Sequence, residues 1–363
     1  MTLRLSLALL LLFACDSSSS GPAGGGGGDG SPPGGDGAPG SADASSSSSD
    51  DAGAGMQLGT VTVVDDPCPD GDGELPGTSC QLVEVACPGI PALRAQVRTT
   101  PPASSDVTRG TILFGTGGGG ESWYERGRTA AAMLRALAGD GFQIVQRAWI
   151  DQWESGGAGL AAAACRYATL LTWVHDEVRD DGALCATGNS GGSAEIGYAL
   201  SRWDREGILD LAVPTGGPVM SRVDLGCLDF EEWPEQCQEL PDGTVCEPAG
   251  VQCNYQGSNF QHIDGAYLPD TPCELHDETF ADTLLADSIL SPDADLDFGA
   301  TPVHQLLGER DCSPALPQGV LWFDAITSQK ARTFVPDTGH GTAGTEEGAA
   351  AIRRVLDEEC VAR

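Results

Sequence analysis

The chain has 363 residues, carries a formal net charge of −34 and contains 40% hydrophobic residues. A chain this acidic repels the phosphate backbone, which excludes nucleic acid as a partner. Its length and apolar content suit one large α/β domain with an insertion, preceded by N-terminal segments of different composition.

The N-terminus carries the pattern of an export signal. Arg4 precedes an apolar stretch at residues 5–13, which is too short to span a membrane and is typical of a cleaved signal peptide. The sequence that ends at Cys15 resembles the lipobox of bacterial lipoproteins, in which the cysteine becomes the lipidated first residue of the mature chain. We therefore expect a signal peptide at residues 1–14 and a membrane anchor at Cys15. Cleavage after Ala14 without a lipid is the alternative.

Residues 15–56 form a low-complexity segment. From Asp16 onward the segment consists almost entirely of Gly, Ser, Ala, Pro and Asp, so it cannot bury a core. We expect a disordered tether that holds a domain at residues 57–363 away from a membrane surface. The resemblance to lipoproteins implies a protein of the bacterial cell envelope that faces the periplasm or the exterior.

Of the 13 cysteines, all except Cys15 follow the tether. The remaining number is even, and an even number of cysteines behind an export signal predicts disulfides. None of these cysteines has the Cys-x-x-Cys spacing of a zinc or redox site. We therefore expect neither a metal nor any other cofactor.

The domain begins with two β-like runs at residues 81–86 and 93–99, which predict an antiparallel pair. From residue 110 onward, apolar strands alternate with helix-like stretches, which predicts a mostly parallel sheet with helices on both faces. The strands are expected at residues 110–114, 143–148, 182–186, 209–213 and 301–307, with a last strand at either 319–323 or 330–335. The helices are expected at residues 126–138, 160–178 and 346–358 and directly after Ser190.

Residues 220–297 interrupt the alternation of strands and helices. This stretch contains five cysteines with many Pro, Glu and aromatic residues, and it lacks a regular hydrophobic period. We therefore expect a Cys-rich cap, inserted after one of the sheet strands.

Ser190 lies in the sequence Gly-Asn-Ser-Gly-Gly between an apolar strand and a helix. A serine exposed on so tight a turn leaves no room for side chains two residues before or after it, which explains Gly188 and Gly192. The motif arises by chance in a chain rich in Gly and Ser, so the flanking strand and helix carry the prediction. The sequence predicts a nucleophile at Ser190.

A serine hydroxyl needs a base within hydrogen-bond reach, and that base needs an acceptor that orients it. His340 is followed by a glycine in a Gly- and Thr-rich loop near the C-terminus, which favours it as the base. Asp311 directly follows an apolar strand and is our candidate acceptor, with Asp324 and Asp337 as alternatives. The competing histidines fall in an expected helix, an expected strand or the cap: His175, His304, His262 and His276.

The glycine run at residues 117–120 follows the strand expected at 110–114. Acyl transfer builds negative charge on an oxygen, and backbone N–H groups without side chains can close around that oxygen. A flexible turn in a Gly-rich protein is the alternative. A dinucleotide site is not expected, because the combination of a Gly-x-Gly-x-x-Gly loop with a ribose-binding acid is missing.

The order Ser190, Asp311, His340 is the chain order of α/β-hydrolase enzymes, and residues 80–363 resemble that superfamily. The resemblance rests on the serine motif, on the strand end before Asp311 and on the glycines that flank His340. It implies the α/β-hydrolase fold with a Cys-rich cap, a nucleophile at Ser190, an orienting acid at Asp311 and a general base at His340.

The glycine run resembles the His-Gly-Gly-Gly loop of esterases and lipases, with Thr116 in place of the histidine. The resemblance implies an oxyanion hole made from the backbone of the following residues: Gly117, Gly118, Gly119 and Gly191. The function that follows is an extracytoplasmic serine hydrolase that cleaves small-molecule carboxylic esters through an acyl-enzyme. An exopeptidase or amidase of the same fold and a non-catalytic binding lipoprotein are the alternatives.

Overall fold

A computed structural model describes residues 57–71, 73–103, 108–246 and 249–362. The expected signal peptide, the lipidation site at Cys15 and the tether lie outside the described residues.

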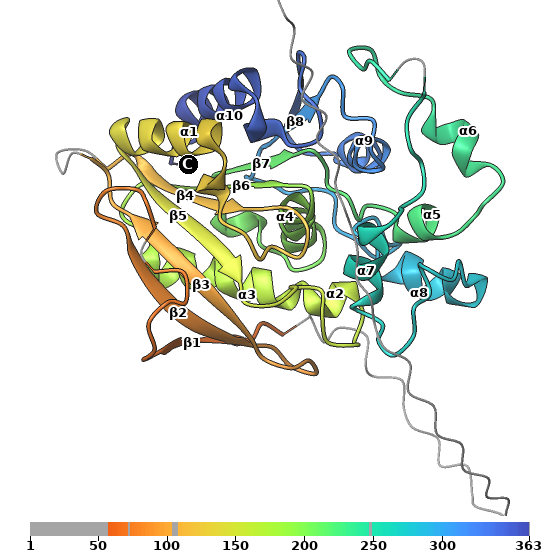
Figure 1. Cartoon of the computed structure of the whole chain (residues 1–363), viewed down its shortest axis with the longest axis horizontal. Helices are drawn as coiled ribbons and strands as arrows, with labels where there is room; N and C mark the ends of the chain where they lie inside the picture. The colour runs from red at the N-terminus through yellow and green to blue at the C-terminus, as the bar shows by residue number, and fades with distance from the viewer. Residues whose placement is uncertain (1–56, 72, 104–107, 247–248, 363) are drawn as a thin grey trace, which may run out of the picture. The chain divides into compact units, whose positions relative to one another are not determined.

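A mixed sheet forms the centre of the described part (Figure 1). Its strands are β1 (Thr60–Val64), β2 (Ser79–Ala86), β3 (Leu93–Thr100), β4 (Gly110–Gly115), β5 (Phe142–Trp149), β6 (Ala183–Asn189), β7 (Leu211–Thr215), β8 (Val303–Gly308) and β9 (Lys330–Val335). They are ordered β1-β2-β3-β5-β4-β6-β7-β8-β9. The pairs β1–β2, β2–β3 and β3–β5 are antiparallel, and all neighbours from β5 to β9 are parallel. The predicted mostly parallel sheet is confirmed.

Helices cover both faces of this sheet. The longer ones are α1 (Arg128–Gly139), α3 (Cys165–Trp173), α4 (Gly191–Ser201), α9 (Ala315–Ala325) and α10 (Glu346–Glu359). Side chains alternate along β4: Ile112 and Phe114 join the core under α1 and α10, whereas Leu113 joins the core under α3 and α4. A strand buried on both faces reads as a continuous apolar run, which is why the sequence revealed these strands.

The structure differs from the prediction at several elements. The expected helix at 160–178 is divided into α2 (Leu160–Ala163), α3 and a π-helical turn at Val174–Val178. The run at 319–323 belongs to α9 and the last strand is β9, because a short apolar run does not by its period distinguish a strand from a helix. Strand β1 was not predicted, since it pairs only with β2 at the edge and leaves most of its side chains exposed.

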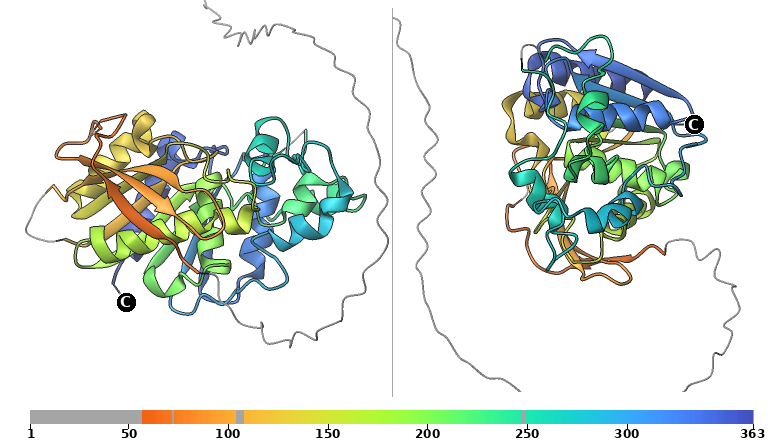
Figure 2. Two further views of the ribbon diagram at one scale, coloured as in Figure 1. Left: turned by 90° about the horizontal axis from the view of Figure 1, so that it is seen from below. Right: turned by 90° about the vertical axis from the view of Figure 1, so that its right-hand side faces the viewer.

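The segment between β7 and β8 contains residues 220–297, which we call the cap. Its α-helices are short: α5 (Val223–Cys227), α6 (Trp233–Cys237), α7 (Ser258–Asp264) and α8 (Ala281–Ala286). Figure 2 shows them gathered at one end of the sheet, next to α9. Their shortness explains why no helical period was visible in this part of the sequence.

The described cysteines form disulfides, as predicted. They are Cys68–Cys80, Cys87–Cys165, Cys185–Cys360, Cys227–Cys273, Cys237–Cys253 and Cys246–Cys312. Two of them close loops inside the cap, and Cys246–Cys312 joins the cap to the segment after β8. None of the helices in the described ranges has the length and apolar character needed to cross a bilayer.

Candidate active site

The predicted site residues follow the carboxyl ends of parallel strands. Ser190 directly follows β6, Asp311 lies three residues after β8, and His340 lies in the loop after β9. Gly115 at the end of β4 pairs with Gly188 near the end of β6. The glycine run and Ser190, which follow these two strands, therefore begin side by side at the same edge of the sheet. The carboxyl edge of an open parallel sheet is where such folds bind ligands.

Ser190 has the backbone conformation of a nucleophile elbow. Its φ is 56° and its ψ is −116°, a backbone conformation that residues other than glycine rarely adopt. A Cβ at Gly188 would lie 2.4 Å from the carbonyl oxygen of Gly192, and a Cβ at Gly192 would lie 2.6 Å from that of Gly115. Both glycines of the motif are therefore required by close backbone contacts, as the sequence predicted.

His340 and Asp311 are joined by a hydrogen bond. Nδ1 of His340 donates to Oδ2 of Asp311 at 2.9 Å, and Asp311 is buried. Ser313 holds the other carboxylate oxygen, because its hydroxyl donates to Oδ1 at 2.6 Å and its backbone N–H donates to the same atom at 3.2 Å. With Nδ1 carrying the proton, Nε2 of His340 keeps a lone pair that can accept one.

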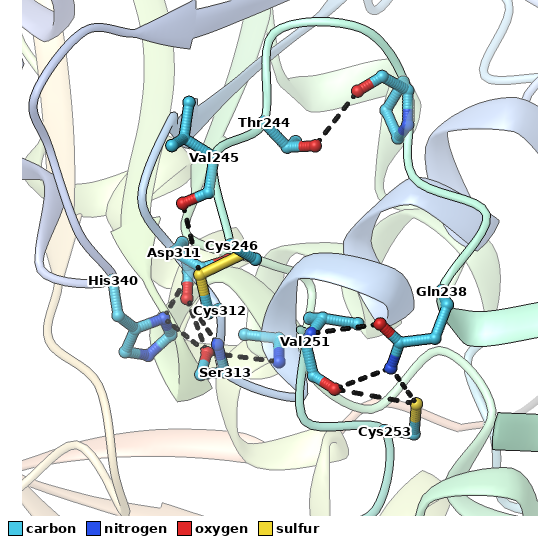
Figure 3. The surroundings of a disulfide bond; sticks show 12 residues. Gln238, Thr244, Val245, Cys246, Val251, Cys253, Asp311, Cys312, Ser313 and His340 are labelled. Atoms are coloured by element: carbon cyan, nitrogen blue, oxygen red, sulfur yellow. Dashed lines mark hydrogen bonds and ion pairs between the residues drawn. A yellow bond between two sulfur atoms is a disulfide. The ribbon is translucent and has the colours of Figure 1, made fainter. Parts of the chain in front are cut away.

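The cap is connected to the loop that carries Asp311. Cys312 follows Asp311 and forms its disulfide with Cys246, as Figure 3 shows. One residue before Cys246, the N–H of Val245 donates to the carbonyl of Glu309 at 2.7 Å. A movement of this part of the cap therefore acts directly on the backbone beside Asp311.

Asn189 links the His340 loop to the elbow. Its side-chain oxygen Oδ1 accepts from the N–H of Thr342 at 3.2 Å and from the hydroxyl of Thr215 at 3.1 Å. Thr342 lies two residues after His340, and Thr215 ends β7. The residue directly before Ser190 thus sets the distance between the elbow and the loop of His340.

The glycine run packs against the elbow. A Cβ at Gly117 would lie 2.8 Å from Cβ of Ser190, and a Cβ at Gly191 would lie 2.1 Å from the carbonyl oxygen of Gly118. Gly191 is the first residue of α4, so its N–H has no partner within the helix. Gly119 lies one residue further along the run, where a Cβ would meet Gln152. The backbones of Gly117 and Gly118 therefore lie directly against the elbow, with no side chain between them and Ser190 or Gly191.

A buried arginine donates hydrogen bonds to the backbone of this run. Arg147 of β5 donates to the carbonyl of Gly120 at 2.9 Å and to that of Thr116 at 3.4 Å, and it forms an ion pair with Glu195 of α4. Trp149 also donates to Glu195, at 2.7 Å. Burial lowers the pKa of Arg147 to about 10, so the group stays charged at neutral pH. Arg147 therefore binds the carbonyl of Gly120, the last residue of the run, and that of Thr116, which directly precedes it.

One cavity of about 260 Å³ contains Ser190 and His340 in its wall. The loops that follow β4, β6, β8 and β9, together with the first residues of α4 and α9, contribute Gly118, Ser190, Gly191, Ser313, Pro314, Ala315 and His340. The remaining lining residues come from the cap and from the segments after β5 and β7: Glu154, Val219, Met220, Tyr255, Ser258, Asn259, His262 and Ile263. The cap therefore forms much of the wall that faces the serine.

Several residues of this site were not singled out from the sequence. Arg147 lies in the middle of an apolar strand and Glu195 within an almost wholly apolar helix, and a charge inside such a run signals a buried partner. Asn189 and Ser313 gave no such signal, because small polar residues are common in turns. Among the described residues, no group of three or more His, Cys, Asp or Glu side chains could hold a metal ion.

Neither a family model nor a curated protein matches the sequence. Among solved structures, an esterase from Pyrobaculum calidifontis is 17% identical, with a TM-score of 0.51 over 78% of this chain and 86% of its own. A structure described as an arylesterase is 14% identical, with a TM-score of 0.50 over 80% of this chain and 87% of its own. Likeness at such low identity establishes the fold and nothing finer. The chain has the α/β-hydrolase fold.

Proposed function

We propose that this protein is an extracytoplasmic serine hydrolase that cleaves carboxylic esters of small molecules. The observation that carries the proposal is the convergence of Ser190, on its strained turn, and His340, hydrogen-bonded to buried Asp311, on one cavity. The similarity in fold to an esterase and an arylesterase agrees with this substrate class.

In the proposed mechanism, Oγ of Ser190 attacks the ester carbonyl carbon while Nε2 of His340 takes the serine proton. Asp311 orients the imidazole and stabilises its charged form. Backbone N–H groups among Gly117, Gly118, Gly119 and Gly191 bind the oxyanion. His340 then gives the proton to the leaving alcohol, and water hydrolyses the acyl-enzyme by the same steps.

We also propose that the chain is exported and anchored through a lipid on Cys15. The six disulfides support an oxidising compartment, and the lipobox-like sequence supports the anchor. Mass spectrometry of the mature protein tests this part. We expect a diacylated N-terminal Cys15, and a mature chain that begins further along without a lipid would contradict it.

The activity is tested on the purified domain with p-nitrophenyl esters, aminoacyl anilides and a fluorophosphonate probe. We expect ester turnover and covalent labelling, and we expect Ser190→Ala and His340→Ala each to lower kcat by about 10³-fold or more. Faster turnover of the anilides would indicate an exopeptidase or amidase instead. A folded wild-type protein that is neither labelled nor active would indicate a binding protein.

A further inference from the structure

Two polar side chains in the cavity wall have no role in the proposed triad. Glu154 follows β5 and is fully buried, and both of its carboxyl oxygens lack a hydrogen-bond partner among the described residues. His262 of α7 presents Nδ1 to this carboxyl group, 3.9 Å from Oε1, and Nδ1 likewise has no partner. Buried polar groups are almost always hydrogen-bonded, so three unpaired atoms facing one another need an explanation.

The ring of His262 lies against the glycine run. A Cβ on Gly118 would be 3.4 Å from both Cε1 and Nε2 of His262, so this edge of the imidazole faces the run. The neighbouring Gly117 contacts Ser190 in the same way. His262 thus turns Nδ1 towards Glu154 and Nε2 towards the loop in which the ester oxygen is expected.

The segment around Glu154 is fixed on the same loop. The N–H of Trp153 donates to the carbonyl of Gly119 at 3.1 Å. Arg166 of α3 donates to the carbonyls of Trp153 at 2.6 Å and Ser155 at 2.5 Å, on either side of Glu154. The backbone on either side of Glu154 is therefore held by contacts that do not involve His262.

Both members of the pair are kept uncharged by burial. Desolvation raises the pKa of Glu154 well above its usual value, and Glu121 adds to this, whereas the nearby N–H of its own backbone, Arg147 and Arg166 oppose it. Desolvation also lowers the pKa of His262, with Glu121 opposing. Tyr198 of α4 faces Glu154 as well and stays neutral, because burial raises its pKa far above the physiological range. A neutral carboxyl group can donate its proton in a hydrogen bond to a neutral imidazole.

We propose that Glu154 and His262 act as a pair in which the carboxyl O–H binds Nδ1 and thereby fixes the proton of His262 on Nε2, as a side-chain donor to the oxyanion. A shift of the ring by about 1 Å closes the present gap to hydrogen-bond distance, and such bonds are often long before substrate binds. His262 is then a catalytic residue contributed by the cap, and Glu154 is a positioning residue that acts through it. This inference rests on the proposed ester hydrolysis.

The arrangement favours an oxyanion donor over a second general base. A base would need an acceptor nitrogen towards the substrate, which places the proton on Nδ1 and requires an ionised Glu154 to accept the hydrogen bond from Nδ1–H. Burial opposes that ionisation. A donor at Nε2 instead complements negative charge that develops beside Gly118, and donors of this kind act on kcat.

The test compares kcat and KM for p-nitrophenyl acetate in matched variants. His262→Phe keeps the ring without its N–H, and we expect kcat to fall about 10²-fold with little change in KM. Glu154→Leu should lower kcat about tenfold, whereas Glu154→Gln should stay within about threefold of wild type, because the amide also donates to Nδ1. The double variant Glu154→Leu/His262→Phe should be no slower than His262→Phe alone. His175→Phe is the control for loss of an unrelated histidine.

The proposal is overturned if His262→Phe keeps its kcat or changes KM alone, if Glu154→Gln is as slow as Glu154→Leu, or if the two losses multiply. Thermal unfolding of each variant separates these outcomes from misfolding. The nitrogen-15 NMR shifts of His262 give a readout that does not depend on turnover. A proton on Nε2 in the wild type supports the pair, and a proton on Nδ1 overturns it. A wild type with this tautomer but no esterase activity would contradict the proposed function only.

Discussion

Cys246 of the cap is bonded to Cys312, the residue that follows Asp311. The cap is thereby attached covalently next to Asp311, whose carboxylate must stay oriented towards Nδ1 of His340 in the proposed triad. We therefore expect the Cys246–Cys312 disulfide to affect activity more than the two disulfides that lie within the cap.

Removal of this disulfide should lower activity beyond its effect on the cap. In Cys246→Ala/Cys312→Ala we expect kcat/KM to fall about tenfold, because the backbone beside Asp311 loses its covalent restraint. Cys237→Ala/Cys253→Ala removes a disulfide that lies wholly within the cap and is the matched control, for which we expect less than a threefold change. Steady-state kinetics with p-nitrophenyl acetate measure both. Equal losses in the two variants would contradict the link to Asp311.

Gly191→Ala should damage the oxyanion hole while the domain stays folded. The added Cβ would meet the carbonyl oxygen of Gly118 at 2.1 Å, so the glycine run must move away from Ser190. We expect kcat to fall by about 10²-fold, the usual effect of losing one oxyanion donor. Gly344→Ala is the control, since a Cβ there meets nothing within 4 Å. Unchanged kcat in a folded Gly191→Ala protein would argue against this placement of the hole.

Arg147→Met should separate stability from activity. The variant leaves Glu195 buried without its ionic partner, which costs about 3–5 kcal/mol. Arg147→Met/Glu195→Leu removes both charges and should recover most of that stability in denaturant unfolding. Its kcat should stay low, because the carbonyls of Thr116 and Gly120 have lost their donor.

The control for Arg147→Met is Arg353→Met, which breaks an exposed ion pair with Asp140. We expect a loss below about 1 kcal/mol from this change. Recovery of full activity together with stability in the double variant would show that Arg147 serves the core and not the glycine run.

Glu154→Gln should stabilise the fold increasingly as the pH rises. Below the ordinary pKa of a glutamate, the carboxyl group is protonated in both folded and unfolded chains, so the two proteins differ little. Above it, the unfolded wild type ionises while burial keeps the folded group neutral, and the wild type loses stability up to the raised pKa of the folded state. The glutamine does not titrate, so the difference in Tm, measured between pH 4 and pH 8, should widen as the pH rises above the ordinary pKa of a glutamate and level off only where the folded group ionises.

Glu358→Gln, at the far end of α10, removes an exposed carboxylate and controls for the loss of one negative charge. A difference in Tm between wild type and Glu154→Gln that stays constant across this pH range would show that Glu154 is not held neutral in the fold.

The fold class could be predicted from the sequence alone, and so could the proposed chemistry of a serine nucleophile with a histidine base. Buried parallel strands are apolar on both faces, so they were visible as continuous runs, and the sharp turn at Ser190 requires glycines that were visible as a local motif. The pair of His340 and Asp311 was predicted from chain order and neighbouring glycines, and the structure brings the two side chains within hydrogen-bond distance. The oxyanion roles of the glycine run and the lipid on Cys15 stay predictions.

Only the tertiary structure decided which distant residues support those motifs. Arg147 and Glu195 are separated by 48 positions, and the disulfide partners Cys185 and Cys360 by 175. Contacts of this kind depend on how strands and helices pack, and no local period or spacing records them. The same holds for Glu154, which follows β5, and His262 of the cap, which lie 3.9 Å apart in the wall of one cavity.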